Sequence, residues 1–359
     1  MKQRFIMVGA GGFSLFWQKL FLPEMKEFAI PVAAVAVSEE ALRNPVENGV
    51  LPPEKCYLDA RRAIEENPCD FLVLIIPPQA RMAYIDLAIE YGLDVLCEKP
   101  LADTMDHACE IYMKMKAAGR KLAVTVSHRF EQSKQSLEEL LDTGDYGKLN
   151  YIVGKLTMPR GPGSGFHAAD RPLEESILNS FSGGLIHELD TFRGLTHSNG
   201  KRVFAKLWKF RPEDNLYAST AIASVVMENG VVCTLEHSGS NASGHNGWAH
   251  EYYRAECAKA TLELDAETLT VCSQVNAGLP LLEQKPLSDS SDIWAHAMIM
   301  RDFCAWREGG RPCKTNIDDN MHCCALTFAA VESAIENREV DVEEYLKRYQ
   351  EKYGFALDC

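Results

Sequence analysis

A glycine cluster lies near the start of the chain, where it could hold a phosphate group. The sequence GAGGFS at positions 9–14 follows the short apolar run 4–8 and precedes a stretch with a helical pattern. In a GxGxxG turn the first glycine makes the tight turn, and the second lets backbone N–H groups approach a pyrophosphate at the helix N-terminus. Ser14 replaces the third glycine and is still small enough for close packing of a helix on a strand. The cluster therefore predicts a dinucleotide site contacted by Gly9, Gly11, Gly12 and Phe13.

The end of the second apolar run bears on which dinucleotide fits. An Asp or Glu at this position would bind the hydroxyls of the adenosine ribose, but the chain has Ser38, which cannot act as that carboxylate. Ser38 with Arg43 could accommodate a 2′-phosphate, whereas Glu39 and Glu40 would repel one. The sequence therefore predicts NAD or NADP as cofactor and leaves the choice between them open.

Polar residues also follow two later apolar runs. The run 71–76 is followed by Pro77, Gln79 and Arg81. Open α/β sheets bind ligands at the carboxyl ends of their strands, so we expect these residues to contact the cofactor. The next run, 94–97, ends in Glu98, Lys99 and Pro100. A Lys-Pro pair by itself is common in surface turns.

A histidine and an aspartate stand three residues apart in the sequence GGLIHELD at positions 183–190. At this spacing His187 and Asp190 share one face of a helix. A histidine with a pKa near the operating pH is a good general base, and a neighbouring carboxylate could fix its tautomer. By spacing alone His187 is a candidate to accept a proton and Asp190 a candidate to orient it, but a histidine beside glycines is usually an ordinary polar residue.

Metal-ligand residue types gather further along the chain. They are His237, His245, His250 and Glu251. Zinc takes ligands of these types, but their spacing fits no ligand signature. Loop histidines near Trp248 suit sugar binding or simple solvation equally well. The sequence therefore predicts no metal site.

The elements that must position these residues change in character along the chain. Over the first 125 residues, β-rich apolar runs alternate with helical patterns, which is typical of βαβ units and a parallel sheet. Strands are expected at 4–8, 31–37, 71–76, 94–97 and 122–126, and helices at 13–20, 60–66, 79–91 and 105–118. The run 71–76 is apolar on both faces, as a central parallel strand must be. An α/β Rossmann domain over residues 1–125 is predicted.

A second domain, 126–359, begins where strands joined by turn-like breaks replace this alternation. After a helix at 132–141, strands are expected at 148–158, 203–210, 219–227, 231–237, 252–257 and 261–264. Helices follow at 291–307 and 320–337, and the polar tail after Val342 is expected to form a last helical turn. These patterns predict an α+β substrate-binding domain with an open, predominantly antiparallel sheet, whose terminal helices are candidates to pack back on the first domain.

Composition excludes several classes of protein. The chain has 359 residues, more than the roughly 250 to 300 at which single cores stop growing, so two domains are expected. A net charge of -14 disfavours nucleic acid or membrane as the main partner. The first apolar run is too short for a signal peptide, and no stretch reaches the roughly 18 apolar residues of a membrane helix. The 12 cysteines form no CxxC pair, which predicts reduced thiols and a cytoplasmic protein.

Motifs along nearly the whole chain resemble the glucose-fructose oxidoreductase and inositol dehydrogenase family, often written Gfo/Idh/MocA. They are CEKPLA at 97–102, VSHRF at 126–130, GDYGKL at 144–149 and GGLIHELD at 183–190. One departure concerns Gly183, because many members have an acidic residue four positions before the histidine. An alternative alignment places His187 itself at that earlier position.

The resemblance implies an NAD(P)-dependent dehydrogenase or reductase acting on a CH–OH group of a sugar, cyclic polyol or related hydroxy compound. It implies that Lys99 contacts both substrate and nicotinamide, that Glu98 belongs to the cofactor site, and that Arg129 and His187 bind the substrate. It also implies a homodimer or homotetramer. Pocket shape would come from the loops 160–171 and 238–251.

Two rival functions arise on the same fold. One is a redox-neutral glycosidase that keeps NAD bound and oxidises its sugar transiently. The other is a non-catalytic, cofactor-sensing regulator, which the loss of the acidic position at Gly183 favours. Cofactor that stays bound through purification would favour the glycosidase.

Overall fold

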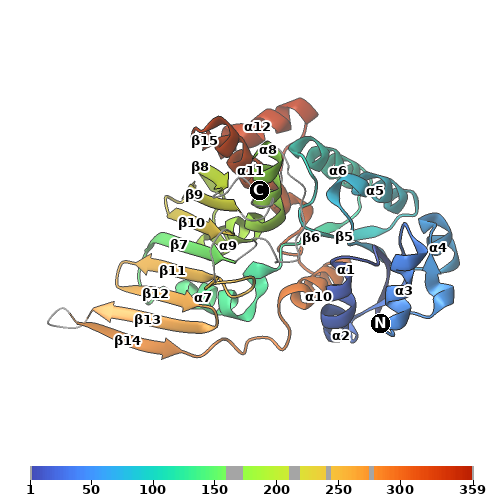
Figure 1. Cartoon of the computed structure of the whole chain (residues 1–359), viewed down its shortest axis with the longest axis horizontal. Coiled ribbons are helices and arrows are strands. Elements are labelled where there is room, and N and C mark those ends of the chain that lie inside the picture. Colours follow the sequence, from blue (N-terminus) through green and yellow to red (C-terminus); the bar gives the residue numbers. More distant parts are fainter. Residues whose placement is uncertain (1, 159–172, 210–218, 240–243, 275–278, 358–359) are drawn as a thin grey trace. The chain divides into compact units, whose positions relative to one another are not determined.

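The computed structural model in Figure 1 describes residues 2–158, 173–209, 219–239, 244–274 and 279–357. The chain divides into two compact units. The first comprises residues 1–127, 293–321 and 349–359, and the second comprises residues 128–292 and 322–348. Two segments near the C-terminus therefore belong to the same unit as the N-terminal residues.

In the described part of the first unit, six parallel strands form one sheet in the order β3-β2-β1-β4-β5-β6. The strands are β1 (Gln3–Val8), β2 (Ala29–Val35), β3 (Cys56–Tyr57), β4 (Phe71–Leu74), β5 (Asp94–Glu98) and β6 (Leu122–Thr125). The last three are buried at every residue, as strands covered on both faces must be. The strand order reverses between β1 and β4, the point at which this fold binds dinucleotides. The predicted Rossmann fold is confirmed.

The helices of this unit include α3 (Glu39–Glu47), α4 (Ala60–Glu66), α5 (Arg81–Glu90), α6 (Met105–Ala117) and α10 (Ala295–Arg307). Side-chain caps mark where α3, α4 and α6 begin. Ser38, Asp59 and Thr104 each accept a hydrogen bond from the backbone N–H three residues later, which satisfies a donor that the first helical turn leaves open. Helix α3 was not predicted, because it has only 9 residues and contains Pro45, which disfavours a helix interior.

The helix expected at 13–20 is in fact three short segments. They are α1 (Ser14–Phe16), the π-helical turn η1 (Trp17–Phe21) and α2 (Leu22–Met25). Pro23 has no N–H to donate to the carbonyl of Lys19, so a regular α-helical ladder cannot continue through this region. The wider π turn carries Trp17, which is fully buried.

The second unit is built on a sheet that has nine strands in its described residues, ordered β14-β13-β12-β11-β7-β10-β9-β8-β15. The strands are β7 (Leu149–Thr157), β8 (Gly200–Lys209), β9 (Ser219–Met227), β10 (Val232–Ser238), β11 (Tyr252–Cys257), β12 (Ala260–Asp265), β13 (Thr268–Gln274), β14 (Pro280–Lys285) and β15 (Val340–Asp341). Only β7 and β10 pair in parallel among them, so the predicted, predominantly antiparallel sheet is confirmed. The predicted end of β8 at Phe210 lies outside the described residues.

Strands β13 and β14 were missed from the sequence. Strand β14 is exposed on both faces over 280–284, so it lacks the alternation of apolar and polar residues that marks a half-buried strand. Its partner β13 is hydrogen-bonded to it along its whole length. An edge strand of this kind is set by its pairing and not by a hydrophobic pattern.

Helices line one side of the sheet of the second unit. They are α7 (Gln132–Asp142), α8 (Leu173–Ser180), the π-helical turn η5 (Phe181–Leu185) and α9 (Ile186–Thr196). Helix α9 packs on β7 and β10 and also on α7 (Figure 1). Burial of α9 at almost every residue follows from this position between sheet and helix.

Two more helices lie near the C-terminus, α11 (Ile317–Glu336) and α12 (Val342–Tyr353). The expectation of a single helical turn after Val342 is wrong, because α12 has 12 residues. Val342, Tyr345 and Leu346 recur at helical spacing and are buried, which stabilises a full helix despite the polar composition. Among the described residues no helix has both the length and the apolar character needed to cross a membrane.

Candidate functional site

The glycine turn after β1 has the backbone geometry that a dinucleotide site requires. Gly9 has φ +104, and a Cβ there would lie 2.2 Å from the carbonyl oxygen of Ile75. Gly12 has φ +55, and a Cβ built on it would meet nothing within 4 Å. The turn thus lies tight against β4 at Gly9 and faces open space at Gly12, so the residues present fit a bound pyrophosphate.

The serine in place of the third glycine is accommodated inside this turn. Ser14 is fully buried, and its hydroxyl accepts a hydrogen bond from Gln18 at 3.2 Å. Gln18 also donates to the carbonyl of Ala10 at 3.1 Å, so the side chain ties the new helix back to the turn. Phe13, the last predicted cofactor contact of this turn, is 40% exposed. The exposed Phe13 is therefore accessible to a ligand, whereas the buried Ser14 packs inside the turn.

Ser38 lies three residues beyond the end of β2, on the exposed N-terminus of α3. Its hydroxyl accepts from the N–H of Ala41 at 3.2 Å. The side chain therefore has a structural role as a helix cap, whatever it contributes to a nucleotide. The structure places no carboxylate at this cap position, in agreement with the sequence.

The predicted residues after β4 divide into exposed and buried ones. Pro77 and Gln79 are exposed at the carboxyl end of the sheet. Arg81 is buried, and its guanidinium donates to the carbonyl oxygens of Pro100, of Leu101 at 3.1 Å and of Ile76 at 3.0 Å. These contacts support a role for Arg81 in building the strand ends, in place of the direct cofactor contact that we expected.

Glu98 and Lys99 end β5 at the same edge of the sheet. The Lys99–Pro100 peptide bond is cis, and Lys99 is half-buried. The carboxylate of Glu98 is buried and accepts a hydrogen bond from the indole of Trp17 at 2.8 Å. The ring of His296 lies 3.1 Å from the same oxygen. Burial alone would raise the pKa of Glu98, but His296, Lys99 and Trp17 outweigh it and lower that pKa.

In the second unit His187 lies on α9 and is buried in a group of aromatic rings. Its ring stacks on that of His128, with ring centres 3.8 Å apart and planes 13° from parallel. Trp248 meets both rings edge-on, at 4.5 Å from His128 and 5.2 Å from His187. The position of His187 is thus set by stacking against residues from two other segments.

Asp190 lies between two guanidinium groups. Its Oδ1 accepts from Arg193 at 2.7 Å, and its Oδ2 lies 3.2 Å from Nε of Arg129. Arg193 in turn donates to the side-chain oxygen of Asn199. These contacts favour a role for Asp190 in holding Arg129, a role that differs from the one expected beside His187. Arg129 is 9% exposed, so little of it is open to solvent.

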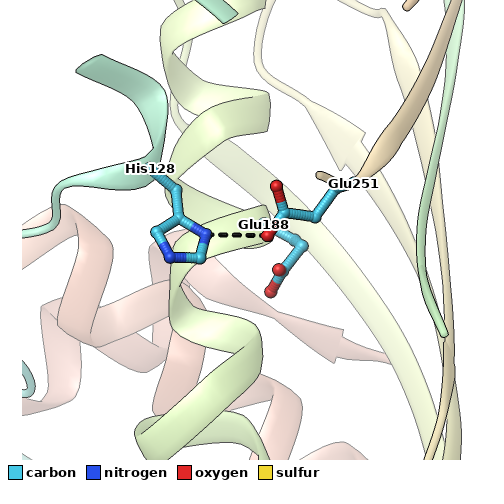
Figure 2. A group of neighbouring side chains, drawn as sticks. All are labelled: His128, Glu188 and Glu251. Carbon is cyan, nitrogen blue, oxygen red and sulfur yellow. Dashed lines mark ion pairs between the residues drawn. The ribbon is translucent and has the colours of Figure 1, made fainter. Parts of the chain in front are cut away.

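A buried charged cluster adjoins this group, and Figure 2 shows three of its members. Nδ1 of His128 lies 3.0 Å from Oε1 of Glu251, and the ammonium of Lys134 lies 2.6 Å from Oε2 of Glu251. Lys134 also pairs with Glu131. The carboxylate of Glu188, the residue after His187, lies beside the His128–Glu251 pair.

The pKa values of the two glutamates of this cluster are shifted in opposite directions. For Glu188, burial and the charge of Glu251 raise the pKa to about 7. For Glu251, burial also favours the neutral form, but His128 and Lys134 outweigh it and the pKa is lowered. The pKa of His128 is raised, because Glu251 and Glu131 outweigh the effect of its burial. Glu251 is therefore a fixed anion, and Glu188 is the carboxyl that changes charge near neutral pH.

Spacing in the sequence does not predict this cluster. His128, Lys134, Glu188 and Glu251 come from four separate segments, and none of them belongs to a spaced motif with another. Glu251 had been considered with His237, His245 and His250, but in the described structure it groups with His128 and Glu188. His245 and His250 are exposed.

Comparison with known proteins places these observations in a family. Residues 3–126 match the sequence profile described as "Oxidoreductase family, NAD-binding Rossmann fold". Over its whole length the chain is 30% identical to the uncharacterized protein y4oX of Sinorhizobium fredii, with 98% of each chain covered. The chain belongs to the Gfo/Idh/MocA family of oxidoreductases.

Other members of the Gfo/Idh/MocA family are similar over part of the sequence or in fold. The chain is 25% identical to an inositol 2-dehydrogenase of Corynebacterium glutamicum over 191 residues, 52% of each protein. Its fold is similar to that of levoglucosan dehydrogenase, solved in complex with NADH and levoglucosan. The TM-score is 0.75 at 18% identity, with 95% of this chain and 100% of that one covered. As a Gfo/Idh/MocA member, the chain is an NAD-binding oxidoreductase.

Proposed function

We propose that this oxidoreductase is an NAD(P)-dependent dehydrogenase that acts on a carbinol carbon of a sugar, cyclic polyol or related hydroxy compound. The observation that carries the proposal is the carboxyl edge of the parallel sheet, where Lys99 ends β5. Strand β5 pairs with β4, which pairs with β1 and its glycine turn. A cation at the end of β5, two strands from the dinucleotide turn at the same edge of the sheet, suits a reaction that develops negative charge on a substrate oxygen.

The protein's part in the reaction is to orient the substrate and to move one proton. When bound, nicotinamide supplies the acceptor or donor of the hydride. His187 would accept the hydroxyl proton as general base, and Lys99 would stabilise negative charge on a substrate oxygen with its ammonium group. Arg129 would contact the substrate while Asp190 holds its guanidinium in place.

The second unit offers a place for a small polar group of the substrate near the start of α9. A small hollow is lined by the turn before α9 and by His237 of β10. Gly183 and Gly184 line it, and a Cβ on either would meet nothing within 4 Å. The missing acidic side chain at Gly183 thus leaves room that this enzyme could use for its substrate. Relatives named for inositol and for D-apiose support the sugar or polyol class.

The test is nicotinamide reduction followed by absorbance, with NAD⁺ and NADP⁺ in turn and a panel of cyclic polyols, aldoses and sugar acids. Turnover with any of them establishes the dehydrogenase and its cofactor preference together. Nucleotide binding without turnover would overturn the proposal. Hydrolysis of aryl glycosides by protein that retains its cofactor would then indicate the redox-neutral glycosidase, and no hydrolysis would indicate the sensor.

Two further expectations belong to this proposal. The outward face of the second sheet carries exposed Trp208 and Ile222, which the pairing of β8 and β9 brings to neighbouring positions. Covering them suits the expected homodimer or homotetramer, which light scattering would measure. The cysteines in the described part of the chain are free thiols, which suits a cytoplasmic location.

A further inference from the structure

The carboxylate of Glu188 is buried without a group that compensates for the loss of its hydration. Glu188 is 0% exposed, and within the described structure neither of its oxygens has a hydrogen-bond partner. A buried carboxylate is stable only when a proton, hydrogen-bond donors or a cation compensate for the water that it has lost. The only ammonium group of the cluster in the described residues, Lys134, is already shared by Glu131 and Glu251.

Donor atoms around Glu188 are spaced as metal ligands are. One ring nitrogen of His128 and one carboxylate oxygen each of Glu188 and Glu251 all lie within 4.8 Å of one another. The closest pair, Nδ1 of His128 and Oε1 of Glu251, is 3.0 Å apart (Figure 2). Two ligands at about 2.1 Å from an ion and at right angles to each other are separated by about 3 Å. The Glu188 oxygen completes the group within the same 4.8 Å limit.

Other residues hold the Glu251 carboxylate in a fixed orientation. Lys134 contacts Oε2 at 2.6 Å, and the backbone N–H of Ala249 donates to Oε1 at 2.9 Å. The edge of Trp248 packs on the ring of His128. Outer contacts of this kind orient the ligands of metal sites before the ion binds.

The charges of the cluster also balance with one divalent ion. Glu131, Glu188 and Glu251 supply three negative charges when ionised, and Lys134 supplies one positive charge. With His128 in the neutral form that ligation requires, one divalent cation brings the sum to zero, as protons on His128 and Glu188 do in the metal-free protein. An uncompensated charge in this cluster would be strongly unfavourable, because four of its side chains are at most 3% exposed: His128, Lys134, Glu188 and Glu251.

We propose that His128, Glu188 and Glu251 form a binding site for one divalent transition-metal ion of the Zn²⁺ or Mn²⁺ type. One imidazole nitrogen with two carboxylates suits these ions better than Mg²⁺ or Ca²⁺, which prefer oxygen ligands alone. The proposal departs from our expectation from the sequence, which was that the chain binds no metal. It does not depend on the dehydrogenase proposal, because its residues and its test involve neither cofactor nor substrate.

A second group of metal-type side chains provides an internal control. Glu138, Asp142 and His197 also bring their ligand atoms within 4.8 Å of one another. Here, however, Asp142 and His197 are more than half exposed and pair with each other at 2.7 Å. Water and this pairing already satisfy both groups, so the second group gives no reason to expect an ion.

The experiment is calorimetric titration of chelator-treated full-length protein with Zn²⁺, Mn²⁺ and Mg²⁺ in turn. We expect one Zn²⁺ or Mn²⁺ per chain, Mg²⁺ binding at least tenfold weaker, and a Glu188→Gln variant that binds Zn²⁺ and Mn²⁺ at least 100-fold more weakly. Asp142→Asn should bind as the wild type does. The proposal is overturned if no stoichiometric binding occurs, if Glu188→Gln binds normally, or if Asp142→Asn abolishes binding.

Mn²⁺ electron paramagnetic resonance of the wild-type protein keeps the test decisive if Glu188→Gln does not fold. Coupling of one imidazole nitrogen to the bound Mn²⁺ is expected from His128. Bound Mn²⁺ without such nitrogen coupling would place the ion elsewhere and overturn the assignment.

Discussion

Two buried glutamates, one in each unit, stand next to the two candidate catalytic residues. They differ in their hydrogen-bond partners and in the direction of their pKa shifts. Glu98 precedes Lys99 and has Trp17 and His296 on its carboxylate. Glu188 follows His187, and its oxygens have no hydrogen-bond partner among the described residues. The pKa of Glu98 is lowered, whereas that of Glu188 is raised to about 7.

The difference shows that burial does not by itself determine what a carboxylate does. Glu98 is a permanent anion that anchors the end of β5 to a tryptophan and a histidine from other elements. Glu188 has only a proton, or an ion that has yet to bind, to compensate for its burial. We therefore interpret Glu98 as a residue that holds the end of β5 next to Lys99. We interpret Glu188 as a carboxyl group that binds either a proton or a metal ion.

The largest expected effect is at Lys99, which the scaffold around Glu98 presents. Lys99→Met should lower kcat by about 10²- to 10⁴-fold, because the ammonium that stabilises the substrate oxygen is lost. Cofactor affinity, measured by fluorescence titration, should change by less than about threefold (about 0.6 kcal/mol). Lys19→Met, at an exposed lysine of the same unit, is the matched control. Equal losses in turnover and in cofactor affinity would contradict this role.

Glu188 should give the stability of the metal-free chain a characteristic pH dependence. Its folded pKa of about 7 lies above the ordinary value of 4.5, so the folded state binds the proton more tightly. Stability therefore falls as pH rises from about 4.5 to 7, by a few kcal/mol at most. Urea unfolding in chelator at pH 5, 6, 7 and 8 should show this decline for the wild type relative to Glu188→Gln. Glu228→Gln, at an exposed glutamate, should leave the decline intact.

A flat difference between the wild type and Glu188→Gln across this range would show that Glu188 has a partner after all. Zn²⁺ offers a second check on the same variant. If the ion compensates Glu188, adding it at pH 8 should raise the stability of the wild type and not that of Glu188→Gln.

Removing charge from each glutamate in turn compares the two sites directly. At pH 8 in chelator, Glu98→Gln should destabilise the protein by about 1.5 to 3 kcal/mol, since it weakens charge-assisted contacts with His296 and Trp17. Glu188→Gln should change stability by less than about 1 kcal/mol or increase it, because no hydrogen bond is lost. Urea midpoints of the two variants decide the matter. Similar destabilisation by both substitutions would remove the distinction that we draw.

Sequence patterns predicted the scaffold around Glu98 better than the surroundings of Glu188. Strands β1, β4 and β5 are apolar runs ended by Gly9, Pro77 and Glu98, and parallel pairing necessarily brings such ends to one edge. The partners of Glu98 were not predicted, because Trp17 lies in a π turn and His296 is 198 residues away. Their contact depends on how α10 packs, which local spacing does not reveal.

The surroundings of Glu188 could not be predicted from spacing at all. No helix was predicted at α9; the HxxD spacing indicated only that His187 and Asp190 would share one face of a helix. The neighbours of α9 depend on the register of β11 against β7 and on the packing of α7. These long-range pairings bring Glu251 and Lys134 to His128. The loop 160–171, which we expected to shape the pocket, lies outside the described residues.

The smallest expected effect is at Ser38, where an exposed side chain caps α3 and also stands where the cofactor ribose is expected. Ser38→Asp should keep the cap, since Asp and Ser are equally good there, and stability should change by less than about 0.5 kcal/mol. The new carboxylate would hold ribose hydroxyls and repel a 2′-phosphate, so the Kd for NADP⁺ should rise about tenfold relative to that for NAD⁺. Ser38→Ala is the matched control, and it should lose about 1 kcal/mol of stability without changing the ratio of the two Kd values. An unchanged ratio in Ser38→Asp would mean that this residue is only a helix cap and that the choice of cofactor is made by other residues.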